Sequence, residues 1–260
     1  MKPSIFFLFA LFLWSAVPAF AQFEYAHEAF SLADMNVKGK VKRIVETKVS
    51  TDRKGRVDDD EKKFRYTYEF DESGRLTQKT VVELGYIESE NYVYRYEYAN
   101  GKLNKVHVKV RYSQPYIRLF NYGSNAILVK NESGDIKEQF SLSNNRIIES
   151  KYFGSSKTLY RYRDLFEYNA TGQVSKKTYM DDAETYRKFS THETYAYNKN
   201  GDRDRKEKFN QEKKLDWITD YDYSYDKNKN WTKCEEMFYS PGEAKDERVY
   251  TRYERTFEYY

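Results

Sequence analysis

The sequence predicts an all-β protein, an antiparallel meander of about fourteen strands stacked as hairpins into a curved open sheet or half-barrel. Two observations predict this fold. A short turn phrase recurs along the chain: an aromatic residue, Asp or Asn, two polar residues, Gly, any residue, then an aliphatic residue or Trp. Between the copies, aromatic and polar residues alternate with a period of two, as from Tyr92 to Tyr98. Such alternation places one aromatic row per strand on a common face.

The turn phrase explains how each hairpin closes. In the clearest copy, from Phe70 to Leu76, Asp71 is expected to accept hydrogen bonds from backbone amides ahead of it. Gly74 then adopts the left-handed conformation that closes the hairpin with a bulge, so that Phe70 lies opposite Leu76. Fuller and weaker copies of the phrase together predict seven structural turn residues: Asp71, Gly74, Gly101, Asn169, Gly172, Gly201 and Asp226.

The spacing of the copies sets the size of the repeat. Successive turn centres lie about 28 residues apart, which is enough for two strands and two turns. The pattern becomes irregular near residues 114–147, where degenerate repeats are expected as the sheet bends. The sequence therefore predicts one β-repeat domain over residues 39–260.

The first 21 residues have the features of an export signal. Lys2 gives a positive start, an apolar run extends from Ile5 to Trp14, and Ala19-Phe20-Ala21 forms a cleavage site of the small-x-small type. We expect cleavage near Ala21-Gln22 and no transmembrane segment afterwards, which places the protein in the periplasm or outside the cell. An uncleaved signal anchor is the alternative.

The lead-in over residues 22–38 contains the one helix expected in the chain. Apolar residues from Phe23 to Ala33 fall near helical spacing, and residues 22–36 contain neither Gly nor Pro. A short helix here would cap the open end of the sheet.

The composition limits the possible partners. The chain has 45 basic and 41 acidic side chains, and this near balance gives no electrostatic reason to expect nucleic acid. It also has 27 Tyr and 17 Phe, although 33% of its residues are charged and its mean hydropathy is −0.97. The charges are too many for a thick core, and the aromatic residues are too many for a disordered chain. Both fit a thin or strongly curved sheet whose Tyr rings cover the backbone.

The phrase resembles a known repeat. The segment Tyr68-Glu69-Phe70-Asp71-Glu72-Ser73-Gly74-Arg75-Leu76 is similar to the YD repeat of Rhs-type bacterial proteins. It more closely resembles small exported bacterial proteins of unknown function with degenerate YD-like repeats, whose opening is similar to residues 39–44 and whose ending is similar to residues 230–260. This resemblance implies stacked hairpins. It does not imply the payload-enclosing shell of large Rhs-type toxins, because the repeats are too few.

No catalytic or metal-binding constellation is visible. The three histidines, His27, His107 and His192, include no close pair. Cys234 is the only cysteine and lies in an apparent strand, so we expect a half-buried small residue rather than a nucleophile, and no internal disulfide. The sequence therefore predicts no cofactor and no enzymatic activity.

Two segments rich in carboxylate or amide side chains are candidate cation sites. Asp226, Asn228 and Asn230 match the opening of a calcium loop, but Trp231 stands where Gly is needed, so turn chemistry is the better explanation. Residues 58–61 are all acidic, and we interpret them as a solvated loop, with a weak cation site as the alternative.

Aromatic surfaces supply the positive functional hint. Tyr-rich surfaces bind well because each ring contributes a large area at low entropy cost. We expect a binding or interaction module of the bacterial envelope, with a protein partner favoured. The alternatives are binding of a glycan or peptidoglycan through the aromatic rows, and a cryptic hydrolase with paired carboxylates. The candidate binding residues are Tyr94, Tyr96, Tyr160, Tyr162, Trp217, Tyr223 and Trp231.

Overall fold

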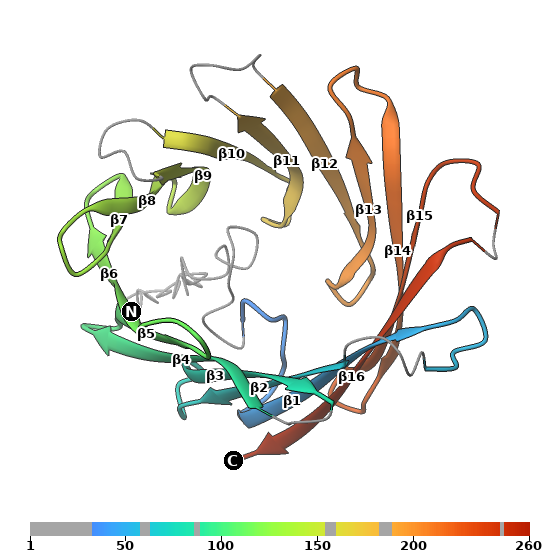
Figure 1. The fold of residues 1–260 in the computed structure, drawn as a ribbon, viewed down its shortest axis with the longest axis horizontal. Coiled ribbons are helices and arrows are strands. Elements are labelled where there is room, and N and C mark those ends of the chain that lie inside the picture. The colour runs from blue at the N-terminus through green and yellow to red at the C-terminus, as the bar shows by residue number, and fades with distance from the viewer. Residues whose placement is uncertain (1–32, 58–62, 86–88, 154–159, 182–188, 245–246) are drawn as a thin grey trace, which may run out of the picture.

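The computed structural model describes residues 33–57, 63–85, 89–153, 160–181, 189–244 and 247–260. These residues form a single antiparallel sheet in which each strand pairs with its neighbours in the chain. The first strand also pairs with the last, so the sheet closes into a barrel (Figure 1).

The described residues contain sixteen strands. The first eight are β1 (Val41–Thr51), β2 (Lys63–Phe70), β3 (Leu76–Leu84), β4 (Ser89–Ala99), β5 (Lys102–Val110), β6 (Tyr116–Tyr122), β7 (Ala126–Lys130) and β8 (Ile136–Ser143). The second eight are β9 (Arg146–Phe153), β10 (Tyr160–Tyr168), β11 (Val174–Asp181), β12 (Phe189–Tyr197), β13 (Arg203–Phe209), β14 (Leu215–Tyr225), β15 (Trp231–Tyr239) and β16 (Val249–Tyr259).

The all-β meander is confirmed, but the open sheet or half-barrel of about fourteen strands is wrong. The barrel closes because β1 and β16 pair along their whole length, from Val41 opposite Tyr259 to Thr51 opposite Tyr250. Inside this seam, the Arg255 guanidinium lies 2.7 Å from the Glu46 carboxylate, and both side chains are only 9% exposed. These partners are 209 residues apart, so no local pattern in the sequence reveals the seam.

One face of the sheet forms the interior of the barrel. The segment 33–40 lies inside the ring of strands (Figure 1), and Met35 and Val37 pack there in a core with Val41 and Ile44. Because side chains alternate along each strand, the residues in register with Ile44, including Tyr68 and Phe257, share this inner face. The aromatic rows therefore point mainly into the barrel.

The predicted turn chemistry is confirmed. Phe70 pairs with Leu76 and Tyr225 pairs with Trp231, each beside a register shift. The Asp71 carboxylate accepts hydrogen bonds of 3.0 Å from the backbone amides of Ser73 and Arg75, and Asn169, Asn198 and Asp226 accept the equivalent bonds in their own turns. The predicted turn glycines all have positive φ: Gly74, Gly101, Gly172 and Gly201.

The repeat length places these turns at one end of the barrel. A repeat of two strands brings the chain back to the same end, which we call the turn rim. It carries turns 71–75, 100–101, 123–125, 144–145, 169–173, 198–202 and 226–230. Tyrosines join neighbouring copies here: the hydroxyls of Tyr98, Tyr168 and Tyr197 donate to the carbonyls of Leu76, Ile147 and Val174. The opposite end, which we call the loop rim, carries the remaining connections.

An apolar floor lies just inside the turn rim. Its fully buried members include Leu76, Leu103, Ile147 and Val174, each close to a turn. The segment before β1 is fastened to this end, since the Asn230 side chain accepts from the Lys38 amide at 2.6 Å and donates to the Lys38 carbonyl at 2.9 Å.

The predicted signal peptide and most of the predicted helix lie outside the described residues. The part of the lead-in that is described, residues 33–38, forms a turn rather than a helix. Within the described part of the chain, no helical segment has the length and apolarity needed to cross a bilayer.

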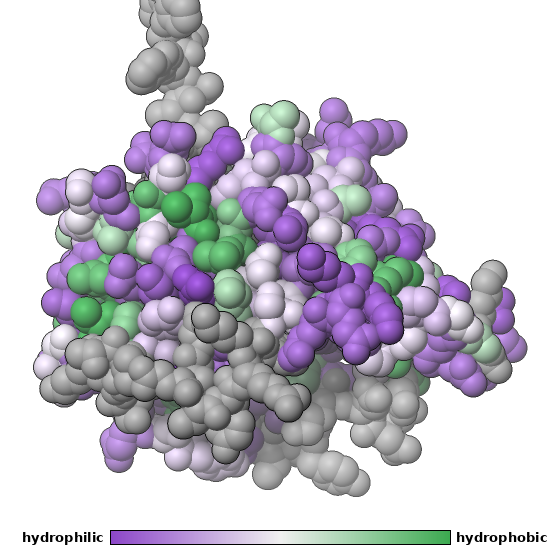
Figure 2. All heavy atoms as spheres, turned by 90° about the horizontal axis from the view of Figure 1, so that it is seen from above, coloured by the Kyte–Doolittle hydropathy of each residue, from purple (hydrophilic) through white to green (hydrophobic). Residues whose placement is uncertain are grey.

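The outer wall is polar. The outer wall of one side of the barrel is mostly hydrophilic, with small separate apolar patches (Figure 2). Ion pairs occur on outward-facing positions around the circumference: Lys42–Glu258, His107–Glu97, Lys151–Glu149–Arg163, Lys176–Glu167, Arg205–Asp220, Lys233–Glu235 and Arg252–Glu254.

Candidate functional site inside the barrel

Four inward-facing residues on adjacent strands form one continuous row. Lys177 on β11 pairs with Glu193 on β12, Glu193 pairs with Lys208 on β13, and Lys208 pairs with Trp217 on β14. Directly opposed residues have Cβ atoms about 5 Å apart, so their side chains can act on one ligand. We call these four residues the inner row.

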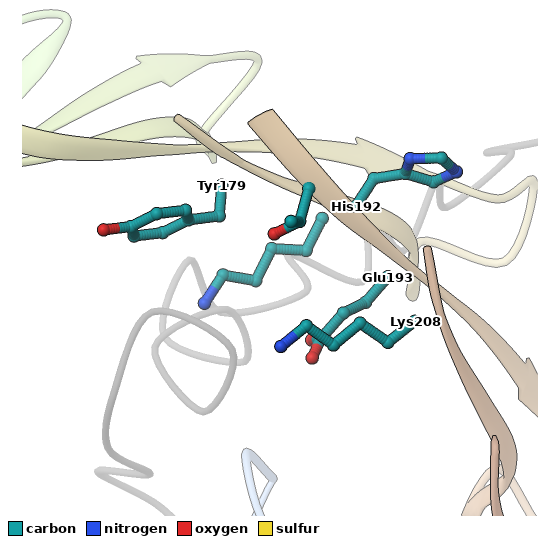
Figure 3. Close-up of a pocket in the computed structure, with 6 residues that line it drawn as sticks. Tyr179, His192, Glu193 and Lys208 are labelled. Atoms are coloured by element: carbon teal, nitrogen blue, oxygen red, sulfur yellow. The ribbon is translucent and has the colours of Figure 1, made fainter. Parts of the chain in front are cut away.

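A cavity of about 280 Å³ lies against the inner row. Its lining includes Lys177, Glu193 and Lys208 of the row, together with Tyr179 and Thr191 one level nearer the loop rim. Tyr179, Glu193 and Lys208 point toward the interior of the barrel, whereas the His192 side chain points away from it (Figure 3). His192 therefore borders the cavity without offering its ring.

A buried carboxylate compensates the first lysine of the row. Asp164 on β10 is 1% exposed, and its Oδ2 atom lies 3.1 Å from Lys177 Nζ. Burial raises the pKa of Asp164 above its ordinary value, and the neighbouring ammonium of Lys177 only partly opposes this shift.

Asp164 also carries an unused acceptor. Its Oδ1 atom is buried without a hydrogen-bond partner. Ser150, directly opposite Asp164 on β9, is fully buried, and its hydroxyl has no partner either. A buried polar group without a partner is costly. These two oxygens are enclosed and do not line the cavity.

The other charges of the inner row differ in their partners. The Tyr195 hydroxyl donates to Glu193 Oε2 at 2.6 Å, which stabilises the carboxylate. Lys208 has no ion pair among the residues that the structure describes. The row thus contains a lysine that is ion-paired with Asp164, and a glutamate and a lysine that lie directly opposite each other.

Aromatic rings flank the row on both sides. Tyr152 and Tyr162 stack with centroids 4.4 Å apart, and Tyr162 lies 5.5 Å from Tyr179 at the edge of the cavity. On the other side, Trp217 stacks on Phe238 at 4.7 Å. The cavity therefore has hydrogen-bonding charges and the Tyr179 ring in its lining, and Trp217 follows Lys208 on the next strand.

The structure separates the seven predicted binding residues into groups. Tyr162 and Trp217 are neighbours of cavity residues, Tyr162 of Tyr179 and Trp217 of Lys208. Tyr94 and Tyr96 lie on β4 with the apolar core, where Tyr96 is 6% exposed. Tyr223 and Trp231 belong to another packed cluster, in which their ring centroids are 5.9 Å apart. The central carbon of the Arg255 guanidinium lies 3.5 Å from the centroid of the Trp231 ring.

Tyr160 lies on the opposite face from Tyr162, so the prediction that these two share a face is wrong. A register shift between Tyr160 and Tyr162 reverses the alternation. The cationic groups of Lys151 and Arg163, both on the outer wall, lie 5.4 and 5.9 Å from the centroid of the Tyr160 ring.

Four charged residues of the candidate site are absent from the binding residues that the sequence predicts: Asp164, Lys177, Glu193 and Lys208. Charged residues are so frequent in this chain that no single one stands out. A usable signal exists, however: these charges occupy positions that the alternation assigns to the aromatic face, such as Glu193 two residues before Tyr195.

Other sequence predictions have clear outcomes. Cys234 is more buried than expected, at 4% exposure, and burial raises the pKa of its thiol to about 12. His107 lies on the outer wall, 2.6 Å from Glu97. Asp226 and Asn230 act in a turn as predicted, and no cluster of metal-ligating side chains is found within the described ranges. His27 and the acidic residues 58–61 lie outside those ranges.

Comparisons with known proteins agree with the barrel fold. No protein-family model matches the chain, and no curated protein matches its sequence. A porin-like protein from Bacteroides uniformis has a similar structure, with a TM-score of 0.52 and 11% identity over 84% of this chain and 96% of that one.

Two further solved structures are less similar. A porin-like protein from Bacteroides vulgatus has a TM-score of 0.41 and 9% identity over 85% of this chain and 99% of that one. A DUF1329 family protein from Desulfovibrio piger has a TM-score of 0.31 and 11% identity over 87% of this chain and 88% of that one. At these identities only the likeness of fold to the first structure is informative.

Proposed function

We propose that the protein is a non-enzymatic binding protein of the bacterial envelope that holds a saccharide inside its barrel. The observation that carries this proposal is the cavity at the inner row, where charged hydrogen-bonding groups lie beside the ring of Tyr179 and where Trp217 is the neighbour of Lys208 on β14. Sugar rings stack on aromatic faces, while their hydroxyls use mixed donors and acceptors. The partners in this cavity are lysine ammonium groups and carboxylate oxygens.

The inward direction of the aromatic rows favours a saccharide over a protein partner. A protein surface could not reach rings on the inner face of a closed barrel, whereas an oligosaccharide is narrow enough to enter. The glycan alternative from the sequence is therefore better supported than the protein partner that the sequence favoured. Among the residues that the structure describes, the cavity lining contains a single carboxylate, Glu193, whereas glycoside hydrolysis uses a pair, so we propose binding without hydrolysis.

The proposed location is outside the cytoplasm, with the barrel surrounded by water. A barrel embedded in a bilayer presents an apolar outer band, and charges at its mid-height are costly. The ion pairs around the outer wall support an aqueous position, in the periplasm or at the cell surface. The proposal includes a relationship to small exported YD-like repeat proteins, because the chain has their repeated turn and a predicted export signal.

A titration with envelope polysaccharide fragments tests the proposed function. We expect the purified protein to bind a saccharide from this mixture, and Trp217→Ala to weaken the binding at least about fivefold, if a sugar ring stacks as favourably as a nucleic-acid base, by about 1–3 kcal/mol. Tyr112→Ala is the matched control, because Tyr112 is 84% exposed and far along the chain from the inner row. Equal binding by both variants would contradict the proposed site.

A protein partner remains a second candidate, now on the outer wall. A groove of about 410 Å³ crosses β3 to β6, with Val93 and Ile117 beside the basic residues Arg95 and Lys109. If an envelope protein binds here, Arg95→Glu combined with Lys109→Glu should abolish its capture from envelope extract and leave saccharide binding intact. Unchanged capture would remove this candidate.

A further inference from the structure

Two lysines on β13 have no ion pair among the described residues. Lys206 and Lys208 both point into the barrel, because Lys206 pairs with the inward-facing Tyr195 and Lys208 pairs with Glu193. Their Cα atoms are two residues apart on one strand, a distance of about 6.7 Å. Two ammonium groups at this spacing can contact a single carboxylate from either side.

Compensation elsewhere in the site makes these lysines distinctive. Lys177 is neutralised by Asp164 at 3.1 Å. Glu193 keeps its negative charge while it accepts the 2.6 Å hydrogen bond from the Tyr195 hydroxyl, and it lies directly opposite Lys208. Lys206 and Lys208 therefore share one facing carboxylate, which leaves the site with one net positive charge. An ammonium group in a partly enclosed site attracts an anion more strongly than one in open water, since screening is weaker there.

An aromatic ring lies directly beside this charge. Trp217 is opposite Lys208 in the register of β13 and β14, and its ring is held by stacking on Phe238. A sugar ring stacked on Trp217 would place a substituent carboxylate next to Lys208.

We infer that the ligand is an acidic saccharide, a chain with uronic-acid units or similar carboxylated rings, and that Lys206 and Lys208 bind its carboxylate. This inference rests on the proposed function and specifies its ligand class. It assigns Trp217 to the ring and the two lysines to the carboxylate.

A matched pair of ligands tests the inference. Oligogalacturonate and its methyl ester have the same rings and differ only in the carboxylate charge, and neutral oligosaccharides complete the panel. We expect the wild-type protein to bind the acid about tenfold more tightly than the ester, as for one charge-assisted hydrogen bond, and to lose this difference at high salt.

Substitutions locate the charge. Lys208→Gln, and separately Lys206→Gln, should reduce the affinity for the acid to that for the ester and leave the ester unaffected. Lys176→Gln is the control, because Lys176 lies on β11 beside Lys177 but faces outward and pairs with Glu167. Thermal melting verifies that each variant is folded.

The outcomes separate the two proposals. If acid and ester bind equally, or only neutral saccharides bind, the anion inference is wrong and the saccharide-binding function stands. If no saccharide in the panel binds, both are wrong. Loss of acid binding in Lys176→Gln as well as in Lys208→Gln would also overturn the assignment to β13.

Discussion

At the scale of the residue, Asp71 shows how one side chain fixes a turn. Its Oδ1 atom accepts from the amides of Ser73 and Arg75, and its Oδ2 atom accepts from Arg75 Nε at 2.8 Å. Burial alone would raise the pKa of Asp71, but hydrogen bonds from Ser73 and Arg75 outweigh it and hold this pKa below its ordinary value. The ionised carboxylate therefore stabilises the folded state.

The substitution Asp71→Asn tests this charge. Asn can form the same turn, as Asn169 and Asn198 do, so only the charge-assisted part should be lost, about 1 kcal/mol or 2–4 °C in Tm at neutral pH. A lowered folded-state pKa gives stability that is present above the unfolded pKa and lost as the pH falls through the folded one. The Tm values of the wild type and of Asp71→Asn should thus converge as the pH is lowered from 7 to 2. A constant difference in Tm would contradict this account.

At the scale of the element, the hairpin turn is the unit of the fold. Its parts reach into the next repeat: the guanidinium of Arg146 lies 5.3 Å from the centroid of Tyr168, as that of Arg75 lies 5.0 Å from the centroid of Tyr98. The Tyr168 hydroxyl donates back to the Ile147 carbonyl at 2.6 Å. Each turn therefore stabilises its own hairpin and the adjacent one.

Gly172→Val should lower the stability of the protein clearly. Gly172 has a φ of +89°, which is unfavourable for a β-branched residue, and an added Cβ would lie 2.7 Å from Arg146 Nη2. We expect a loss of about 2 kcal/mol, or 4–8 °C in Tm. Gly85→Val is the control, since Gly85 lacks a positive φ and a Cβ there would meet no atom within 4 Å. Equal melting temperatures for the two variants would argue against the hairpin geometry.

Local patterns predicted these elements well because their causes are local. Asp71, Gly74 and Leu76 act within seven residues, and alternation follows from strand geometry alone. The prediction was wrong at Tyr160, where an extra residue in β10 reverses the faces. A bulge depends on pairing with β9, which the sequence of β10 does not display.

At the scale of the whole molecule, closure decides where the aromatic rows point. An open sheet would expose them, whereas the β1–β16 seam turns most of them into the interior. The sequence analysis could not anticipate this seam, because Glu46 and Arg255 are an ordinary glutamate and arginine in their local contexts. It could not locate the site either, since the inner row becomes visible only when four strands are in register.

The seam can be tested with two ion pairs on its opposite faces. The substitution Glu46→Gln leaves the buried Arg255 charge uncompensated and should lower the free energy of unfolding by about 3 kcal/mol. Glu258→Gln breaks the exposed Lys42–Glu258 pair of the same two strands and should cost under about 1 kcal/mol. Denaturant unfolding measures both values. Similar small effects would indicate that β1 and β16 are not joined.

A crystal structure of the protein soaked with a uronic-acid trisaccharide tests the saccharide site inside the barrel. We expect sixteen strands in a closed barrel, with a sugar ring stacked on Trp217 and its carboxylate within hydrogen-bonding distance of Lys206 or Lys208. A saccharide bound only on the outer wall, or an open sheet with its aromatic rows exposed to solvent, would show that the barrel interior is not the binding site.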